Sequence, residues 1–184
     1  CPLNRDALLK IGASAGSDVP FFISGAAAAW VSGRGELIKP LEAPRCFFVL
    51  VNPGIISDTS EAYRLLDLER SGKSEPVQEI AGKKEDCEDN HEFYSIPPQR
   101  WPFFNDFLPI LRNLEHSLYS KIISQLTEQG AGFTGLSGTG STCFGVFLEK
   151  ENAEKATEAL LKTWYFVKIA LPACKNAFIE SFFS

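Results

Sequence analysis

The sequence predicts an α+β fold, with a ferredoxin-like two-layer sandwich over residues 45–184. Three observations support this expectation. The 184 residues are 45% hydrophobic, enough for one domain or for one domain and part of another. Pro40 and Pro44 bracket a domain boundary, so residues 1–44 are expected to belong to a separate domain. The elements after this boundary follow the order strand, helix, helix, strand, strand, helix, strand, which is typical of that sandwich.

Residues 1–44 predict one helix and three short strands. Asn4 is a suitable N-cap for a helix over residues 5–15, and Gly16 ends that helix. Strands are expected at residues 21–23, 26–31 and 37–41, with a hairpin turn at residues 33–36.

The second domain begins with a continuous apolar strand, residues 46–51, of the kind that is covered on both faces. A long helix is expected over residues 105–129, because apolar residues recur there at spacings of three and four. The charged stretch 69–100 predicts a long, partly mobile surface loop whose role the sequence does not give. The other expected elements are a helix at 60–70, a strand at 143–148, a helix at 152–163 and a strand at 165–171.

Composition narrows the functional class. The formal net charge of −5 argues against a protein that binds duplex nucleic acid through bulk charge. No apolar run is long enough to predict a membrane span. The five cysteines are widely spaced, which favours reduced thiols in a cytoplasm over a metal cluster or a disulfide framework. We therefore expect a bacterial cytoplasmic protein, or a plastid one, that binds neither nucleic acid nor membranes.

The chain contains no methionine, even at position 1. Either it is a fragment or a processed form, or methionines were dropped from the sequence. We accordingly expect further sequence upstream of residue 1.

A glycine-rich stretch is the strongest local signal for chemistry. It contains Ser137, Gly138, Thr139, Gly140 and Ser141, and it leads into the strand at residue 143. Glycines let backbone N–H groups approach a ligand, and hydroxyls add donors, so such a loop suits a phosphate. The stretch is neither a P-loop nor a dinucleotide fingerprint. A plain turn between two strands is the alternative.

Two further signals are weaker in isolation. Asp18 lies in an apolar neighbourhood before Pro20. It is either a helix cap or turn former, or a partly desolvated carboxylate that accepts a hydroxyl proton. Thr59 and Tyr63 follow the buried strand and the Asn-Pro-Gly sequence at 52–54, where loops often line a pocket. Helix capping by Thr59 and packing by Tyr63 are the alternatives. The acidic cluster at residues 85–89 favours a solvated loop over a cation site.

Taken in order, these motifs resemble the GHMP (galacto-, homoserine, mevalonate, phosphomevalonate) kinase superfamily. The resemblance is carried by five segments: 16–22 (Gly-Ser-Asp-Val-Pro-Phe-Phe), 33–36 (Gly-Arg-Gly-Glu), 52–54 with Thr59 and Tyr63, 105–106 (Asn-Asp), and 137–145, which is similar to the third superfamily motif. The first two segments point to the branch whose substrate is a cytidine diphosphate sugar-alcohol.

The resemblance implies an ATP- and Mg²⁺-dependent kinase that phosphorylates a small-molecule alcohol for the non-mevalonate isoprenoid pathway. By position, Asp18 corresponds to the catalytic aspartate, Tyr63 to the aromatic residue stacked on cytosine with Thr59 near it, and residues 137–141 to the phosphate-side loop. The resemblance also implies that Asp18 and this loop share one cleft.

The superfamily's ATP loop and its lysine partner are not in this chain. Residues 1–44 are therefore expected to be a remnant of the N-terminal ATP-binding domain, and the missing N-terminal half of the same protein is an expected partner. The chain alone is expected to be inactive. Two alternatives stay open: another kinase of the superfamily, of homoserine or mevalonate type, and a non-catalytic ferredoxin-like binding module.

Overall fold

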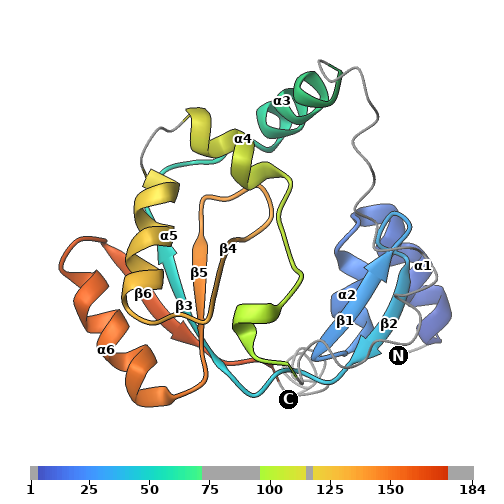
Figure 1. Cartoon of the computed structure of the whole chain (residues 1–184). Helices are drawn as coiled ribbons and strands as arrows, with labels where there is room; N and C mark the ends of the chain where they lie inside the picture. Colours follow the sequence, from blue (N-terminus) through green and yellow to red (C-terminus); the bar gives the residue numbers. More distant parts are fainter. Residues whose placement is uncertain (1–3, 72–95, 115–117, 174–184) are drawn as a thin grey trace. The chain divides into compact units, whose positions relative to one another are not determined.

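The computed structural model describes residues 4–71, 96–114 and 118–173 (Figure 1). These residues form two compact units. The smaller one comprises residues 4–45 with residues 172 and 173, and the larger one comprises residues 46–171. Both units contain helices and an antiparallel sheet, so the predicted α+β class is confirmed.

The smaller unit contains two helices and a β-hairpin. Helix α1 spans Arg5–Ala15, and Asn4 caps it as predicted, because its side-chain oxygen accepts a hydrogen bond from the Ala7 N–H at 2.9 Å. The hairpin pairs β1 (Ala28–Ser32) with β2 (Leu37–Leu41) in antiparallel register. Its turn occupies the Gly-Arg-Gly-Glu sequence, as expected.

The strand predicted at residues 21–23 is wrong, because these residues lie in helix α2 (Val19–Ser24). Pro20 stands in the first turn of this helix, where it is tolerated, and Gly25 ends it with a left-handed φ of 66°. Ile23 packs so closely on Gly12 of α1 that a Cβ at Gly12 would lie 2.6 Å from the Ile23 Cδ1. This helix–helix packing outweighs the strand preference of the Phe-Phe-Ile sequence.

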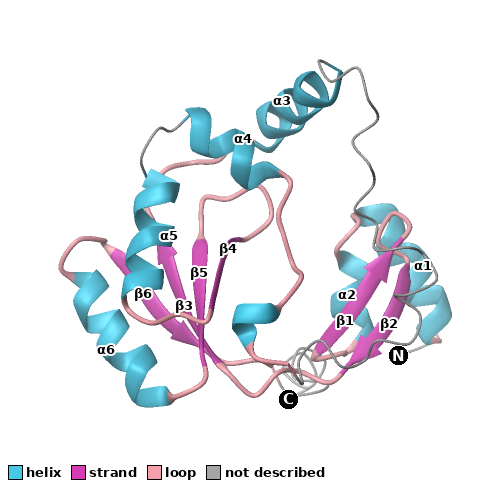
Figure 2. Cartoon of the chain, in the orientation of Figure 1, coloured by secondary structure: helices cyan, strands magenta, loops and turns pink. Residues whose placement is uncertain are grey.

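The larger unit is built on a four-stranded antiparallel sheet with the order β4-β5-β3-β6 (Figure 2). Its strands are β3 (Phe47–Asn52), β4 (Phe133–Leu136), β5 (Cys143–Phe147) and β6 (Phe166–Ala170). In chain order these are the second, third, first and fourth strands, which is the ferredoxin-like arrangement that the sequence predicts. The remaining elements are α3 (Thr59–Ser71), the 3₁₀ turn η1 (Pro98–Arg100), α4 (Phe107–Leu114), α5 (Leu118–Glu128) and α6 (Lys150–Leu161).

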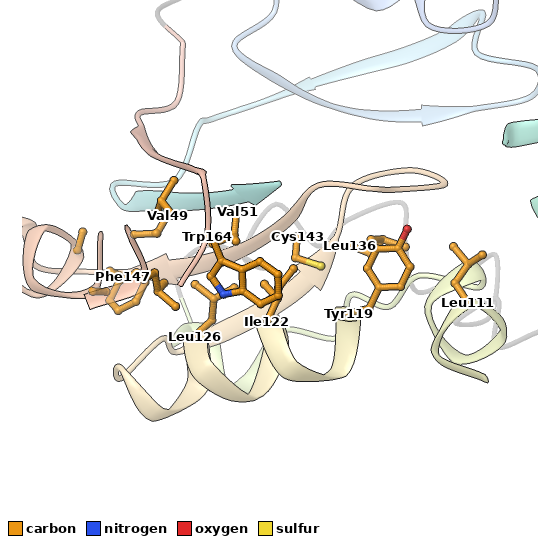
Figure 3. Close-up of a cluster of buried hydrophobic side chains, with 14 of the residues drawn as sticks. Val49, Val51, Leu111, Tyr119, Ile122, Leu126, Leu136, Cys143, Phe147 and Trp164 are labelled. Carbon is orange, nitrogen blue, oxygen red and sulfur yellow. The ribbon is translucent and has the colours of Figure 1, made fainter. Parts of the chain in front are cut away.

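Helices α5 and α6 cover one face of this sheet and enclose the main core. Val49 and Val51 alternate along β3 with half-buried neighbours and are fully buried against these helices. Figure 3 shows Ile122 and Leu126 of α5 pointing toward the strands, and both side chains are fully buried. The opposite face carries an aromatic cluster, which contains Phe48, Trp101, Phe103, Phe133 and Phe144.

The helix predicted over residues 105–129 is divided between α4 and α5, whose axes run in different directions in Figure 1. Residues 115–117 lie outside the described ones. Most of the predicted loop at 69–100 and its acidic cluster, residues 85–89, also lie outside them.

Cys46 and Cys143 are both buried. Burial raises the pKa of Cys46 to about 11, so this thiol is no nucleophile at neutral pH. Of the helices in the described ranges, none combines the length and the apolar character needed to cross a membrane.

Candidate functional site

The glycine turn, residues 137–142, joins β4 to β5. It is closed by two backbone hydrogen bonds, from the Ser137 N–H to the Thr142 carbonyl and from the Gly140 N–H to the Ser137 carbonyl, both 2.9 Å. Gly138 and Gly140 have φ values of 55° and 92°, which side chains rarely adopt. A Cβ at Gly140 would also lie 3.0 Å from the Tyr119 hydroxyl. The glycines are therefore required by the shape of the turn.

A second segment, residues 52–59 between β3 and α3, is bonded to this turn. The Asn52 amide donates to the Thr142 hydroxyl at 2.9 Å, and the Ser141 hydroxyl donates to the Ile55 carbonyl at 2.7 Å. The Ser57 hydroxyl donates to the Thr139 carbonyl. Hydrogen bonds thus hold residues 52–59 and the glycine turn together, although more than 80 residues separate the bonded pairs.

Thr59 and Tyr63 lie on the first turns of α3, beside the glycine turn. Thr59 does not cap the helix, because the Glu61 N–H is accepted by Asp58 at 3.1 Å. The Thr59 hydroxyl instead lies 3.2 Å from that of Thr139. Tyr63 is 54% exposed, and the edge-to-face contact of its ring with Phe107 has a centroid separation of 5.0 Å. An exposed aromatic ring therefore lies one helical turn beyond the residue whose hydroxyl approaches the glycine turn.

Asn105 was not assigned a role by the sequence analysis, yet it bridges α4 and the glycine turn. Its side-chain N–H groups donate to the carbonyls of Leu136 (2.9 Å) and Gly138 (2.8 Å). Its side-chain oxygen accepts from the backbone N–H groups of Phe107 (2.8 Å) and Leu108 (3.2 Å). Its place two residues before the first residue of α4 is the sequence signal for the cap, but no local signal indicates the bonds to the turn.

A cavity of about 300 Å³ opens beside Asn105. It is lined mainly by apolar side chains, among them Phe103, Leu108, Phe133 and Phe144. Apolar walls do not suit a phosphate. The polar groups that do suit one lie at the turn: among the described residues, none accepts a hydrogen bond from the backbone N–H of Gly138 or of Thr139.

Asp18 belongs to the smaller unit. It occupies the position before α2, but its side chain forms no capping hydrogen bond, so the helix-cap alternative is not supported. Asp18 does lie in a turn, which the Val19 N–H closes on the Gly16 carbonyl at 3.3 Å, so the turn-former alternative stays open. The carboxylate is exposed in this chain rather than partly desolvated as the sequence suggested. The hairpin turn packs against its neighbourhood, since a Cβ at Gly35 would collide with the carbonyl oxygen of Ser17.

The structure thus brings together Thr59, Tyr63 and the turn residues 137–141 within the larger unit. Asp18 lies in the other unit, and its catalytic role stays a prediction. In the described ranges no three His, Cys, Asp or Glu side chains are grouped to hold a metal ion. Among the described residues, the N–H groups of the glycine turn are donors of the kind that a phosphate accepts.

Comparison with known proteins finds a family match within the larger unit. A family model described as "GHMP kinases C terminal" matches residues 102–165. A curated relative from Thermodesulfovibrio yellowstonii, a 4-diphosphocytidyl-2-C-methyl-D-erythritol kinase, is 34% identical over 170 residues, covering 88% of this chain and 56% of the relative. The protein of the same name from Treponema pallidum (strain Nichols) is 32% identical over 165 residues, covering 88% and 55%. The chain spans about half the length of these relatives.

Two solved kinase structures are also similar to this chain. A crystal structure of 4-(cytidine 5'-diphospho)-2C-methyl-D-erythritol kinase matches with a TM-score of 0.65 and 27% identity, covering 91% of this chain and 56% of that one. Homoserine kinase from Cytophaga hutchinsonii matches with a TM-score of 0.64 at 14% identity, covering 95% and 60%. This second likeness shows the fold alone.

Proposed function

We propose that this chain is part of an ATP-dependent kinase for the 2-hydroxyl of 4-diphosphocytidyl-2-C-methyl-D-erythritol, because residues 102–165 match the model of the GHMP kinase C-terminal domain and the similar proteins carry the name of that kinase. The observation that supports this most is the approach of the Thr59 hydroxyl to that of Thr139 in the glycine turn, with the exposed ring of Tyr63 one turn further along α3. Tyr63 on α3 offers an aromatic ring, and the N–H groups of the glycine turn offer hydrogen-bond donors for a phosphate. Such a kinase belongs to isoprenoid precursor synthesis by the non-mevalonate route.

The glycine turn is the proposed phosphate side of the site. The N–H groups of Gly138 and Thr139 and the exposed Ser137 hydroxyl are donors for phosphate oxygens. Phosphoryl transfer depends mainly on positioning and on neutralisation of charge. A rigid set of hydrogen-bond donors helps with both, because it holds the phosphate oxygens and offsets their negative charge. The ATP loop of the superfamily is not in this chain, and a bound Mg²⁺ would offset the charge of the transferred phosphoryl group.

Tyr63 is the proposed platform for the cytosine ring. The edge-to-face contact with Phe107 holds the tyrosine ring while leaving more than half of the side chain exposed. Base–aromatic stacking contributes roughly 1–3 kcal/mol per base in other proteins. This supports a cytidine-containing substrate over homoserine or mevalonate, which have no aromatic ring to stack.

Asp18 is the proposed general base. Its carboxylate accepts the proton of the 2-hydroxyl as that oxygen forms a bond to the γ-phosphorus and the bond to the ADP leaving group breaks. Proton and phosphoryl group are then both accounted for, and ADP and the phosphorylated alcohol are the products.

The test uses a full-length kinase that contains this chain, assayed with ATP, Mg²⁺ and 4-diphosphocytidyl-2-C-methyl-D-erythritol. Asp18→Asn should reduce kcat by at least 100-fold with unchanged substrate affinity, because the base is lost and the shape is kept. Tyr63→Ala should weaken cytidine diphosphate binding by roughly 1–3 kcal/mol, measured by titration calorimetry.

Tyr63→Phe, which retains the aromatic face, is the matched control and should bind normally. Turnover of homoserine or mevalonate, with no response of cytidine nucleotide affinity to Tyr63→Ala, would favour the other kinases of the superfamily. Absence of any kinase activity would favour a non-catalytic binding module.

A further inference from the structure

Asn105 uses its whole hydrogen-bonding capacity on two different elements. An asparagine side chain has two N–H donors and one oxygen with two lone pairs. The two donors of Asn105 bond to the carbonyls of Leu136, the last residue of β4, and of Gly138 in the glycine turn. Its oxygen accepts two N–H groups at the start of α4. Aspartate matches only the second half of this pattern, because an ionised carboxylate has no donor. The glycine turn is therefore bonded to α4 by a carboxamide, and few other side chains supply both the donors and the acceptor that it supplies.

The bond to Gly138 determines which way the next peptide unit faces. In a planar trans peptide the C=O and the following N–H point in opposite directions. The Gly138 carbonyl points to Asn105, so the N–H of Thr139 points away from it. That N–H has no acceptor among the described residues.

The next peptide unit, between Thr139 and Gly140, is held by two further hydrogen bonds. The Ser57 hydroxyl donates to the Thr139 carbonyl, and the N–H of Gly140 in the same peptide unit donates to Ser137. Two adjacent peptide units of a glycine turn, which would otherwise rotate freely, are thus fixed by side chains from two separate segments.

The same helix end also supports the aromatic side of the site. Phe107 donates its backbone N–H to the Asn105 oxygen, and its ring packs edge-to-face on Tyr63. Arg70 near the end of α3 forms an ion pair with Asp106 at 3.1 Å, which joins α3 to α4 a second time. Asn105 therefore lies between the turn and the residues that hold the Tyr63 ring.

We propose that Asn105 is a positioning residue of this kinase, which fixes the peptide between Gly138 and Thr139 so that the Thr139 N–H faces the phosphate. This inference rests on the proposed function. Asn105 acts through the turn and is not itself a catalytic residue.

The experiment uses two variants of the full-length kinase that keep the helix cap and lose the bonds to the turn. Asn105→Asp retains an acceptor for Phe107 and Leu108 but has no donor for Leu136 and Gly138. Asn105→Ser is also a good N-cap, adds no charge, and is too short to reach the two carbonyls. The control is Asn4→Asp, the same substitution at an asparagine whose side chain caps α1 through one acceptor bond.

Both Asn105 variants should lose 10- to 100-fold in kcat, while the dissociation constant for cytidine diphosphate stays within twofold of wild type. Backbone amides of residues 137–142 should exchange with deuterium at least tenfold faster. The Asn4 variant should match wild type in every measurement. If Asn105 were only a helix cap, both variants would keep wild-type kcat and wild-type exchange, and that result overturns the proposal.

If Asn105→Asp does not fold, the result for the uncharged variant Asn105→Ser decides whether Asn105 positions the turn. Faster exchange of the turn with unchanged kcat also overturns the proposal, and it leaves the proposed function intact because the wild-type enzyme is active. An inactive wild-type protein overturns the proposed function instead, and with it the catalytic part of this inference. Exchange of the turn then still tests the hydrogen bonds themselves.

Discussion

Single residues of this chain are required for reasons that spacing alone does not reveal. The sequence places Gly33-Arg34-Gly35-Glu36 in a turn, and the structure confirms it. It does not reveal that Gly35, with φ at 105°, lies against the carbonyl of Ser17, the residue before Asp18. The two motifs that carry the kinase resemblance in the smaller unit are therefore in contact. Contacts between loops of this kind depend on tertiary packing, which no local pattern encodes.

Substitution of Gly35 tests this contact. Gly35→Ala should destabilise the folded state by roughly 3 kcal/mol, because a left-handed φ and a backbone collision act together. Urea unfolding followed by circular dichroism measures the change. Gly130→Ala is the matched control, since Gly130 also has a positive φ of 89° but open space around it, and it should cost only about 1–2 kcal/mol. Equal costs for the two variants would show that the contact with Ser17 has no energetic weight.

At the scale of elements, the sequence predicts most strands and helices but not all of their boundaries. The apolar strand at residues 46–51 and the strand order follow from the pattern of burial and from the order of elements. The error at α2 arose because Phe21, Phe22 and Ile23 have strand preference, whereas the helix signals, Pro20 and Gly25, flank them. The joining of Tyr63 to the glycine turn could not be predicted without the resemblance, because those residues are distant in sequence.

The packing of α5 on the sheet gives a prediction at this scale. A Cβ at Gly145 of β5 would lie 2.9 Å from the Leu126 Cδ2 and 3.1 Å from the Ala131 Cβ. Because Leu126 is fully buried, it cannot move into solvent. Gly145→Ala should therefore cost roughly 1–3 kcal/mol of unfolding free energy, as overpacking does in other cores. Thermal and urea unfolding of the variant would measure it.

A double-mutant cycle separates this collision from other effects of the added methyl group. In a Leu126→Ala background the space near Gly145 is vacated, so adding Gly145→Ala should cost less than half of what it costs in wild type. Strictly additive free energies would contradict the steric explanation and would point to a change in the strand itself.

At the scale of the whole molecule, the chemistry of the proposed kinase is divided between two units. Tyr63, Thr59 and the glycine turn lie in the larger unit, and Asp18 lies in the smaller one. The main hydrophobic core, by contrast, is built only from residues of the larger unit, between Phe47 and Ile169. All four strands of its sheet also come from residues 47–170. We therefore propose that the larger unit is an independently folding domain.

A fragment of residues 46–173 should accordingly fold without residues 1–45. Urea should unfold it in one cooperative transition, and it should bind cytidine diphosphate, because Tyr63 and Phe107 are both present. It should transfer no phosphate, since it lacks Asp18 as well as the ATP loop that the whole chain already lacks. Val49→Ala, which empties space at a fully buried position of β3, should lower the free energy of unfolding of the fragment by roughly 2 kcal/mol. A fragment with no cooperative transition would mean that residues 1–45 complete the fold of the larger unit, and the division into two domains would be wrong.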